Sequence, residues 1–309
     1  MEHKPNLFFE SFFNFSLKVV VFIIIGIFFL LFYSLIERSA PSLLYNGLGI
    51  LFGSSWDPNI GIFGGAPAIL GTISSSAIAL ILALPISLCV SIFYSEYSPH
   101  RIRPFIYGIM DLLAAIPSVI YGIWGLWILS PIIKTNLQDP IIGAIGFIPI
   151  FSGPAYGLSI FLASIILTIM IIPIISSLSI DLFSKTPMHL REGMFALGAT
   201  KWEVVRYVIF PFAKRGVLAA TILGLGRALG ETMAVTMVIG NSYIWPTQSV
   251  SLFAPATTIT SKIASEFPES VINVMHNSSL ISLALVLLLF SITINLVVEF
   301  IAKKSGVSL

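Results

Sequence analysis

The stretch that decides the fold is Arg191–Asn241, REGMFALGATKWEVVRYVIFPFAKRGVLAATILGLGRALGETMAVTMVIGN. It begins as a basic, amphipathic segment and continues into an apolar span that carries Arg227 and Glu231 near its middle. A charged side chain at membrane depth costs at least ~2.5–3.5 kcal/mol on insertion scales, so such a residue indicates a functional site. The two charges lie four positions apart (i, i+4), a spacing that puts both side chains on one face of a helix. The stretch therefore indicates solute passage through a membrane.

The composition excludes several classes of protein. Of 309 residues, 57% are hydrophobic and 10% are charged, whereas a soluble domain carries about 25% charged residues. The net charge of +2 argues against a nucleic-acid binder. A single cysteine, Cys89, excludes an internal disulfide, and the four histidines are scattered without the spacing of metal ligands. We therefore expect a membrane protein with no metal site.

Six apolar stretches are long enough to cross a bilayer core of ~30 Å, which takes about 20 helical residues. They are Leu17–Ile36, Ala68–Phe93, Phe105–Ile133, Gly157–Ile180, Gly216–Gly240 and Leu280–Ile301. The first is too long for the core of a signal peptide and lacks a cleavage site after it, so we interpret it as an anchor helix. The sequence predicts an all-α integral membrane protein with six transmembrane helices.

The connections between the spans differ in charge, which predicts the orientation. With the N-terminus inside, twelve Lys and Arg residues lie in cytoplasmic segments, three lie in external segments, and Arg227 lies within a span. Positive charge concentrates on the cytoplasmic side of membrane proteins. Both termini are therefore predicted to be cytoplasmic.

The chain is expected to divide into three parts. Residues 1–63 form the anchor helix and an external cap, 64–301 form the transmembrane core, and 302–309 form a cytoplasmic tail. The apolar run Ile141–Ile150 is too short to span and is interpreted as interfacial or re-entrant. Pro85, Pro117 and Pro173 fall inside spans, where ordinary helix kinks are expected because neighbouring groups bind the freed carbonyls.

The cytoplasmic segment of residues 181–215, hereafter the 181–215 segment, predicts a compact projection. A helix can begin at Pro187 and break at Gly198, and a second helix can run from Lys201 until Pro211. Its mixed charged and aromatic surface suits docking to a protein partner. An amphipathic helix lying on anionic lipid is an equal alternative from physics alone.

Glu192, Gly198 and Pro211 fall at the spacing E-x-x-x-x-x-G-x12-P, which is similar to the "EAA" coupling loop of ABC importer permeases. In that family the loop seats in a cleft of the ATPase subunit. The resemblance implies a coupling role for Arg191, Glu192, Gly198, Ala199 and Pro211. The family pattern has alanines after the glutamate, then isoleucine and leucine before the proline. Here the sequence departs from it at Gly193, Met194, Val208 and Phe210.

The resemblance extends over about Gly64–Glu299. In order and at family spacing, several further motifs resemble the PstC-type permease of phosphate ABC importers: Gly71-Thr72-Ile73-Ser74-Ser75-Ser76, Ser95-Glu96-Tyr97-Ser98-Pro99, Ile116-Pro117-Ser118-Val119-Ile120-Tyr121-Gly122, Gly224–Val235 and Leu252-Phe253-Ala254-Pro255. Each motif alone is weak, but together they are specific. They imply a type I ABC importer permease fold in a bacterial cytoplasmic (inner) membrane.

What the resemblance implies is one half of a channel. The expected partners are a PstA-type permease, two PstB-type ATPases, and a PstS-type phosphate-binding protein on the outer side. The sequence has no G-x-x-x-x-G-K-[ST] phosphate loop, so it cannot hydrolyse ATP by P-loop chemistry. No catalytic residue or cofactor is expected in this chain, and ATP and Mg are expected on the partner ATPase.

Two interpretations of Arg227 and Glu231 stay open. In the first they line the translocation path, because the guanidinium fork suits phosphate oxygens and Glu231 weakens its grip. In the second they form a buried structural ion pair between packed helices, with Gly226 and Gly230 as a small-residue contact. Ser74 and Ser75 are weaker candidates for the path, since serine in such helices often binds its own carbonyls.

Other functions are less well supported by the residues. A membrane enzyme such as an intramembrane protease would need an H-E-x-x-H pair, a G-x-S-x-G turn or paired acids at membrane depth, and the sequence has none of them. A secondary transporter would show two repeated halves, and no convincing repeat is present. A permease for sulfate or molybdate remains an alternative because these oxyanions differ little in charge from phosphate.

Overall fold

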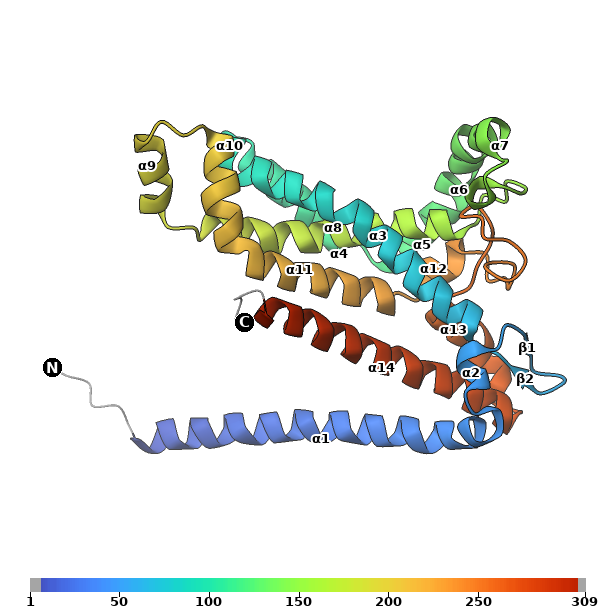
Figure 1. Ribbon diagram of the computed structural model, residues 1–309. Coiled ribbons are helices and arrows are strands. Elements are labelled where there is room, and N and C mark those ends of the chain that lie inside the picture. The colour runs from blue at the N-terminus through green and yellow to red at the C-terminus, as the bar shows by residue number, and fades with distance from the viewer. Residues whose placement is uncertain (1–6, 305–309) are drawn as a thin grey trace.

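The structure is a computed structural model that describes residues 7–304, a chain of long helices running roughly side by side (Figure 1). Six helical segments among these residues are long and apolar enough to cross a membrane: Phe12–Asn46, Ala66–Tyr97, Ser118–Ile145, Ile160–Ser184, Lys201–Gly230 and Val274–Val297. The predicted all-α fold with six spans is confirmed. Residues 1–6 and 305–309, which belong to the predicted anchor and tail, lie outside the described residues.

The N-terminal half builds the anchor, a short hairpin and two spans. Its elements are α1 Leu7–Asn46, α2 Gly49–Phe52, β1 Trp56–Asp57, β2 Ile62–Phe63, α3 Ala66–Ile92, the π turn η1 Phe93–Tyr97, α4 Arg103–Ala115, α5 Ser118–Trp124, the π turn η2 Gly125–Leu129, α6 Ser130–Ile133, the π turn η3 Lys134–Gln138, α7 Asp139–Ile145 and the 3-10 turn η4 Pro149–Phe151. Strands β1 and β2 pair antiparallel, with Trp56 opposite Phe63.

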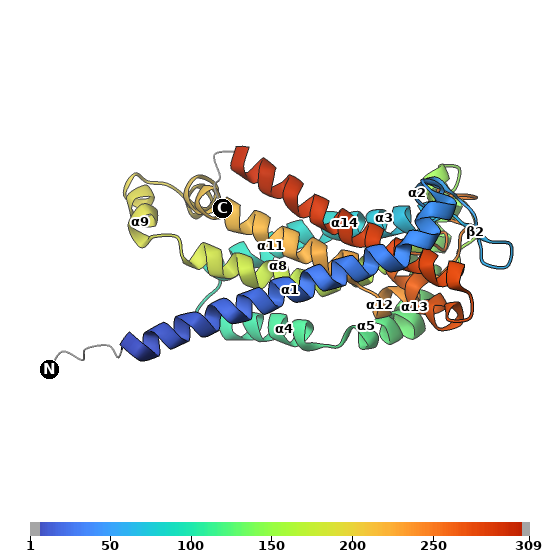
Figure 2. The ribbon, with the colours of Figure 1, turned by 90° about the horizontal axis from the view of Figure 1, so that it is seen from below.

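The C-terminal half contributes the other three spans and the 181–215 segment. Its elements are α8 Ile160–Ser184, α9 Met188–Ala196, α10 Lys201–Val204, the π turn η5 Val205–Ile209, α11 Phe210–Gly230, α12 Met233–Val238, α13 Ile259–Ser270 and α14 Val274–Lys304. Figure 1 shows α9 and α10 at one end, hereafter the knob end. The hairpin, α7 and α13 lie at the other, the hairpin end, and the two views agree (Figure 2).

Helix α8 forms the centre of the core, between α3 and α11. Small residues let α3 approach it closely, because Ala79 and Ala83 are fully buried against α8 side chains. Hydroxyl groups join the two helices, since Ser91 Oγ lies 3.1 Å from the carbonyl oxygen of Ser176 and Thr168 Oγ1 lies 3.3 Å from that of Ala79. These contacts fix the frame on which the other spans pack.

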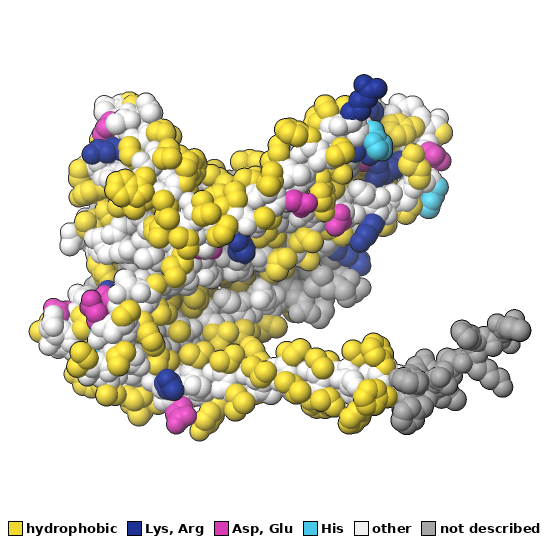
Figure 3. Space-filling view, turned by 180° about the vertical axis from the view of Figure 1, so that it is seen from behind, with side chains coloured by type: hydrophobic (Ala, Val, Ile, Leu, Met, Phe, Trp, Pro, Cys, Tyr) yellow, Lys and Arg dark blue, Asp and Glu magenta, His cyan; other side chains and the backbone are white. Residues whose placement is uncertain are grey.

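Helix α1 is the most peripheral span. Its apolar side chains are largely exposed, and hydrophobic atoms cover it on the face in Figure 3. It packs against α14, where the backbone N–H of Ser42 donates to Ser278 Oγ at 2.9 Å. The exposed apolar surface is what a lipid-facing anchor helix requires.

The third predicted span, Phe105–Ile133, is not a continuous helix. The chain leaves helical geometry at Ile116-Pro117, between α4 and α5. Proline has no N–H to bind the carbonyl four residues earlier, at Leu113. That carbonyl instead accepts a hydrogen bond from the Tyr121 hydroxyl at 2.8 Å. The expected kink at Pro117 is therefore a break, and Tyr121 binds the freed carbonyl.

The helix in the structure differs from the fifth predicted span, Gly216–Gly240, at both ends. The helix begins at Lys201 and continues through Pro211 to Gly230. The expected stop at Pro211 is wrong because η5 precedes it. The π turn widens the helix to i→i+5 bonding, where a residue without an N–H is tolerated. At the far end the helix is broken at Glu231-Thr232 before α12 begins.

The apolar run Ile141–Ile150 folds as α7 and the start of η4 at the hairpin end (Figure 1). Helix α7 has no buried residue, and Phe147 beyond it is 82% exposed. The run therefore lies on the end of the bundle rather than passing through its centre. Its first half, Ile141–Ile145, also continues the helical segment Ser118–Ile145 that is long and apolar enough to cross a membrane, so the interfacial interpretation stays a prediction.

A polar cluster closes the hairpin end. The Glu266 carboxylate accepts hydrogen bonds from Trp56 Nε1 at 2.8 Å and lies 2.5 Å from Lys262 Nζ and 2.9 Å from His276 Nε2. The Lys262 ammonium also lies 5.1 Å from the Trp56 ring centroid and 4.6 Å from that of Tyr243. We call these five residues the hairpin cluster. It joins the hairpin, α13, α14 and the connection after α12.

Candidate functional site

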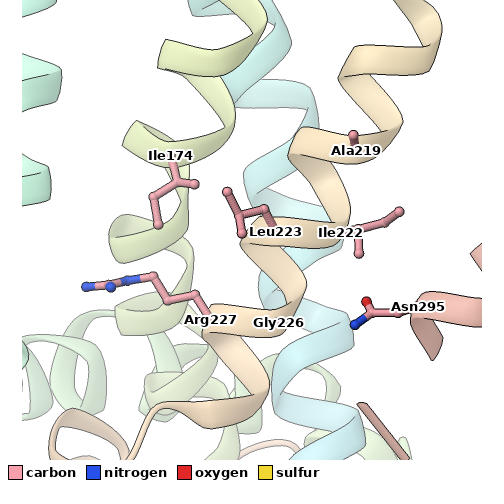
Figure 4. Close-up of a pocket in the computed structure, with 7 residues that line it drawn as sticks. All are labelled: Ile174, Ala219, Ile222, Leu223, Gly226, Arg227 and Asn295. Carbon is pink, nitrogen blue, oxygen red and sulfur yellow. The ribbon is translucent and has the colours of Figure 1, made fainter. Parts of the chain in front are cut away.

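Arg227 lies in the last turn of α11 beside an open groove of about 810 Å³ (Figure 4). The groove is lined by Ile174, Ala219, Ile222, Leu223, Gly226, Arg227 and Asn295. The Arg227 side chain is exposed and points away from Asn295, which lies on the other side of α11. Within residues 7–304, no hydrogen bond or ion pair engages its guanidinium group.

Glu231 does not pair with Arg227 in the described chain. Its Oε1 accepts the backbone N–H of Ala234 at 3.2 Å, and its backbone carbonyl accepts the Thr260 hydroxyl at 2.8 Å. The backbone of Glu231 is extended, with ψ 126°. The one-face spacing predicted for Arg227 and Glu231 is therefore wrong, because the helix ends between them and the carboxylate caps the first turn of α12.

The surroundings of the nearby glycines bear on the structural-pair interpretation. A Cβ added at Gly226 or Gly230 would meet no atom within 4 Å, so neither glycine packs against another helix of residues 7–304. At Gly224 an added Cβ would approach Ile175 Cγ1 to 2.8 Å, so that glycine does serve close packing against α8. Within the described residues, the buried pair with its small-residue contact is not formed.

The chemically useful group of this site is the Arg227 guanidinium, which lies in an apolar span. The described residues do not use its N–H donors. Its five N–H donors form a planar fork that matches a tetrahedral oxyanion. The groove beside it is mainly aliphatic, so water competes less for those donors than at a polar surface. Arg227 therefore suits transient contact with an anion.

The predicted serines do not join this site. Ser75 is buried, and its hydroxyl donates to the carbonyl of Gly71 at 2.7 Å, one turn back on its own helix. Ser74 is half-buried and, like Ser75, does not line the groove. The local hydrogen bond of Ser75 is the one that serine commonly makes in such helices.

At the knob end, the 181–215 segment contains the predicted helix, glycine turn and second helix. Gly198 turns the chain with φ +83°, a left-handed conformation that favours glycine. Thr200 then begins α10 with a capping box, its hydroxyl accepting the backbone N–H of Glu203 at 3.3 Å. The backbone N–H and the hydroxyl of Thr200 both donate to the Glu203 carboxylate and hold its pKa below the usual range.

The surface of this segment is exposed and partly apolar. Met188, Leu197 and Trp202 are 63%, 85% and 55% exposed, and Glu192 is exposed as well. Ala199 instead packs against the apolar cluster that contains Phe183, Val205 and Ile209. Pro211 is exposed at the start of α11. Exposed apolar groups at the tip of a projection are typical of a protein contact.

Arg191 faces inward rather than toward the tip. Its Nη1 lies 2.6 Å from Glu96 Oε1 in η1, and its Nη2 donates to the carbonyl of Phe183 at 2.5 Å. Sequence reasoning missed Glu96 as this partner. Glu96 is the one acidic residue in the basic connection 94–104. A single acid among basic residues could have indicated an ion pair.

Metal coordination has no obvious place in the described part of the chain. In residues 7–304, no group of three or more His, Cys, Asp or Glu side chains is arranged to hold a metal ion.

Figure 3 shows the Lys and Arg side chains of one face concentrated toward the knob end.

The sequence matches the family described as "Binding-protein-dependent transport system inner membrane component" over residues 87–306. It is 42% identical over 275 residues to the "Phosphate transport system permease protein PstC" of Mesorhizobium japonicum, covering 88% of this chain and 83% of the relative. The protein of the same name from Haemophilus influenzae is 44% identical, with 84% and 82% covered. A "Probable phosphate transport system permease protein PstC" of Methanocaldococcus jannaschii is 32% identical, with 92% and 90% covered.

Solved structures share the fold at low sequence identity. A "bacterial ABC transporter involved in the import of the acidic polysaccharide alginate" superposes with a TM-score of 0.55 at 17% identity, covering 96% of this chain and 99% of that one. An inward-facing form of the MetNI methionine ABC transporter also gives 0.55 at 17% identity, covering 81% and 99%. These likenesses show the architecture.

Proposed function

The chain belongs to the family of binding-protein-dependent transport system inner membrane components, and on that premise we infer that it is the permease subunit of an ATP-driven phosphate importer. The observation that carries this inference is the identity of 42–44% to PstC permeases over more than four fifths of both chains. The protein is a multi-pass inner membrane component of an ABC transporter.

We propose that ATP is hydrolysed on partner subunits that dock on the 181–215 segment. This division is supported by the exposed Leu197 and Trp202 at its tip and by the absence of a phosphate loop from the sequence. The proposed assembly contains a PstA-type permease, two PstB-type ATPases with ATP and Mg, and a PstS-type binding protein.

The proposed orientation puts the knob end in the cytoplasm. The first turn of α1 and the last turn of α14 lie at the same end as α9 (Figure 1), and most Lys and Arg of the connections belong to that end. The hairpin end then faces outward, where a binding protein delivers its ligand.

We propose that Arg227 contacts the anion as it passes. Its exposed guanidinium beside the groove supports this role. In this proposal the negative charge of Glu231, which lies at the start of α12 and does not pair with the guanidinium, limits how tightly a doubly charged anion is held. Ser74 and Ser75 are left with a structural role in this proposal, because Ser75 uses its hydroxyl within α3.

Uptake by the reconstituted complex tests the function. Vesicles with ATP inside and binding protein outside should accumulate labelled phosphate, and unlabelled phosphate should compete far better than sulfate or molybdate. Preferential uptake of sulfate or molybdate would replace the substrate assignment while leaving the permease assignment intact. Uptake without any ATPase subunit would remove the ABC importer assignment.

Arg227→Gln tests the path within the same preparation. A hydrogen bond to a charged group contributes ~1.5–3 kcal/mol, so we expect phosphate flux to fall about 10- to 100-fold while complex yield and melting temperature stay unchanged. Arg38→Gln is the matched control, since Arg38 is exposed at the hairpin end of α1. Full flux in an assembled Arg227→Gln complex would exclude Arg227 from the path, and lost assembly would make its role structural.

A further inference from the structure

The side chains of Arg191 and Glu96 form a buried ion pair at the knob end. Only 13% and 10% of these side chains are exposed, and Arg191 adds a second hydrogen bond to the carbonyl of Phe183. Helix α9 has no fully buried residue. Arg191 and Met194, which packs against the apolar cluster of Phe183 and Val205, are therefore the inward-facing side chains of a helix that is otherwise exposed.

Glu96 belongs to a turn that several cations hold. Arg103 donates to the carbonyls of Ser95 at 3.1 Å and Ser98 at 3.3 Å. Lys201 Nζ lies 3.5 Å from the Glu96 carbonyl oxygen and 5.7 Å from the Tyr97 ring centroid. With Arg191, these contacts bring α4, α9 and α10 together on η1. The turn is a fixed point of the knob end.

The turn is continuous with the core of the molecule. It follows α3 directly, and α3 is bonded to α8 by Ser87 and Ser91, whose hydroxyls lie 3.3 Å and 3.1 Å from carbonyl oxygens of α8. The other connections of α9 are the linker before Pro187, the turn at Gly198, and Met194, which packs on the apolar cluster that Leu88 and Ile92 of α3 also contact. A force applied to α9 by a docked subunit therefore enters α3 through this apolar contact and through the directional ion pair with Glu96.

We propose that Glu96 is a positioning residue for coupling: through Arg191 it joins the docking helix α9 to α3, so that motion of the ATPase is transmitted to the spans. This inference rests on the proposed function, because it needs an ATPase docked on the 181–215 segment. It assigns Arg191 to the inner contact of that segment rather than to its docking surface.

The test compares Glu96→Gln, Arg191→Gln and the double variant in the reconstituted complex. Glu96→Gln keeps the size of the side chain and removes its charge. We expect the number of phosphates transported per ATP hydrolysed to fall at least threefold in each single variant. The double variant should be no worse than either single, because both remove the same link. Glu96→Asp retains the charge and should recover part of the phosphate transported per ATP hydrolysed.

Asp181→Asn is the matched control, since it makes the same carboxylate-to-amide change on an exposed residue at the knob end. A second readout needs no transport at all. Trypsin should cleave the 181–215 segment of the detergent-purified complex several-fold faster in Glu96→Gln than in the wild type or in Asp181→Asn.

The two readouts separate the ways of failing. If wild-type vesicles do not transport phosphate, the proposed function is wrong, and the trypsin comparison still decides whether Glu96 holds α9. A normal phosphate-to-ATP ratio in Glu96→Gln overturns the proposal even if cleavage is faster, because the pair is then only structural. Unchanged cleavage, or additive losses in the double variant, also overturns it.

Discussion

The two ends of the molecule are restrained to very different degrees. At the hairpin end, one carboxylate, Glu266, binds side chains from β1, α13 and α14. At the knob end, α9 is held by the ion pair of Arg191 with Glu96 and by the apolar contact of Met194, and a glycine turn borders it. A closed network resists motion of any one member, whereas a surface helix held by two side chains beside a glycine turn can move against the elements below it. The difference indicates a stiff outer end and a knob end that moves.

Burial makes the hairpin cluster costly to disturb. Desolvation lowers the pKa of Lys262, and the hydrogen bond and charge of Glu266 oppose that shift. Desolvation also raises the pKa of Tyr243, with the charge of Glu266 adding to it. The carboxylate therefore stabilises the charged form of Lys262 in a place where water cannot. Removing Glu266 leaves a buried ammonium without its counter-ion.

The largest expected effect follows from Glu266→Gln. Breaking a buried ion pair from one side costs ~3–5 kcal/mol, and we expect the lower end of that range because Glu266 keeps 23% of its side chain exposed. The apparent melting temperature of the purified complex should fall by several degrees. Glu269→Gln, on the exposed side of α13, should leave it unchanged. A stable Glu266→Gln complex would break the contrast between the two ends.

Gly198→Val should disturb the knob end with a smaller cost in stability. A β-branched residue at φ +83° carries a backbone penalty of ~1–2 kcal/mol, and no neighbouring atom lies within 4 Å of an added Cβ. The complex should assemble, while phosphate flux and substrate-stimulated ATPase activity drop together. Gly143→Val in α7, where the backbone is helical and an added Cβ also meets open space, is the control. Normal coupled activity in Gly198→Val would remove the turn from the transmission route.

The smallest effect concerns pH at Glu203. The amide and hydroxyl of Thr200 lower the pKa of the Glu203 carboxyl in the folded state. The ionised carboxylate therefore stabilises the fold at pH values above the ordinary pKa of glutamate. This stabilisation is lost as the pH falls through the lowered pKa. Amide exchange of residues 200–204, corrected for its intrinsic pH dependence, should therefore speed up as pH falls from 5 toward 3. Glu203→Gln should abolish that increase. Equal pH dependence in both proteins would show that the cap does not restrain the knob end.

Local patterns in the sequence predicted much of this architecture. Apolar runs of sufficient length predicted six spans, and Gly198 between two amphipathic runs predicted the turn that the structure contains. These features depend on nearby residues alone, which is why sequence reasoning could find them.

The break at Glu231 could not be found in the same way. A continuous apolar run surrounds it, and the contact that fixes its backbone comes from Thr260, 29 residues away. The helix continues through Pro211 because of η5, and no residue type in η5 predicts a π turn. Glu96 and Arg191 lie 95 residues apart and meet because α3 and α8 end side by side. Contacts of this range belong to the tertiary structure.

Helix α11, from Phe210 to Gly230, acts as a lever. Its 21 residues correspond to a rod of about 32 Å at 1.5 Å per residue, with Arg227 in the last turn. Figure 1 shows that α10 meets the near end of this rod at a marked angle. A tilt of about 5° around the near end displaces the far end by roughly 3 Å, comparable to the size of one oxyanion. Because the backbone stays helical through η5, α10 and α11 are joined without a loop, and motion of the docking segment reaches the guanidinium.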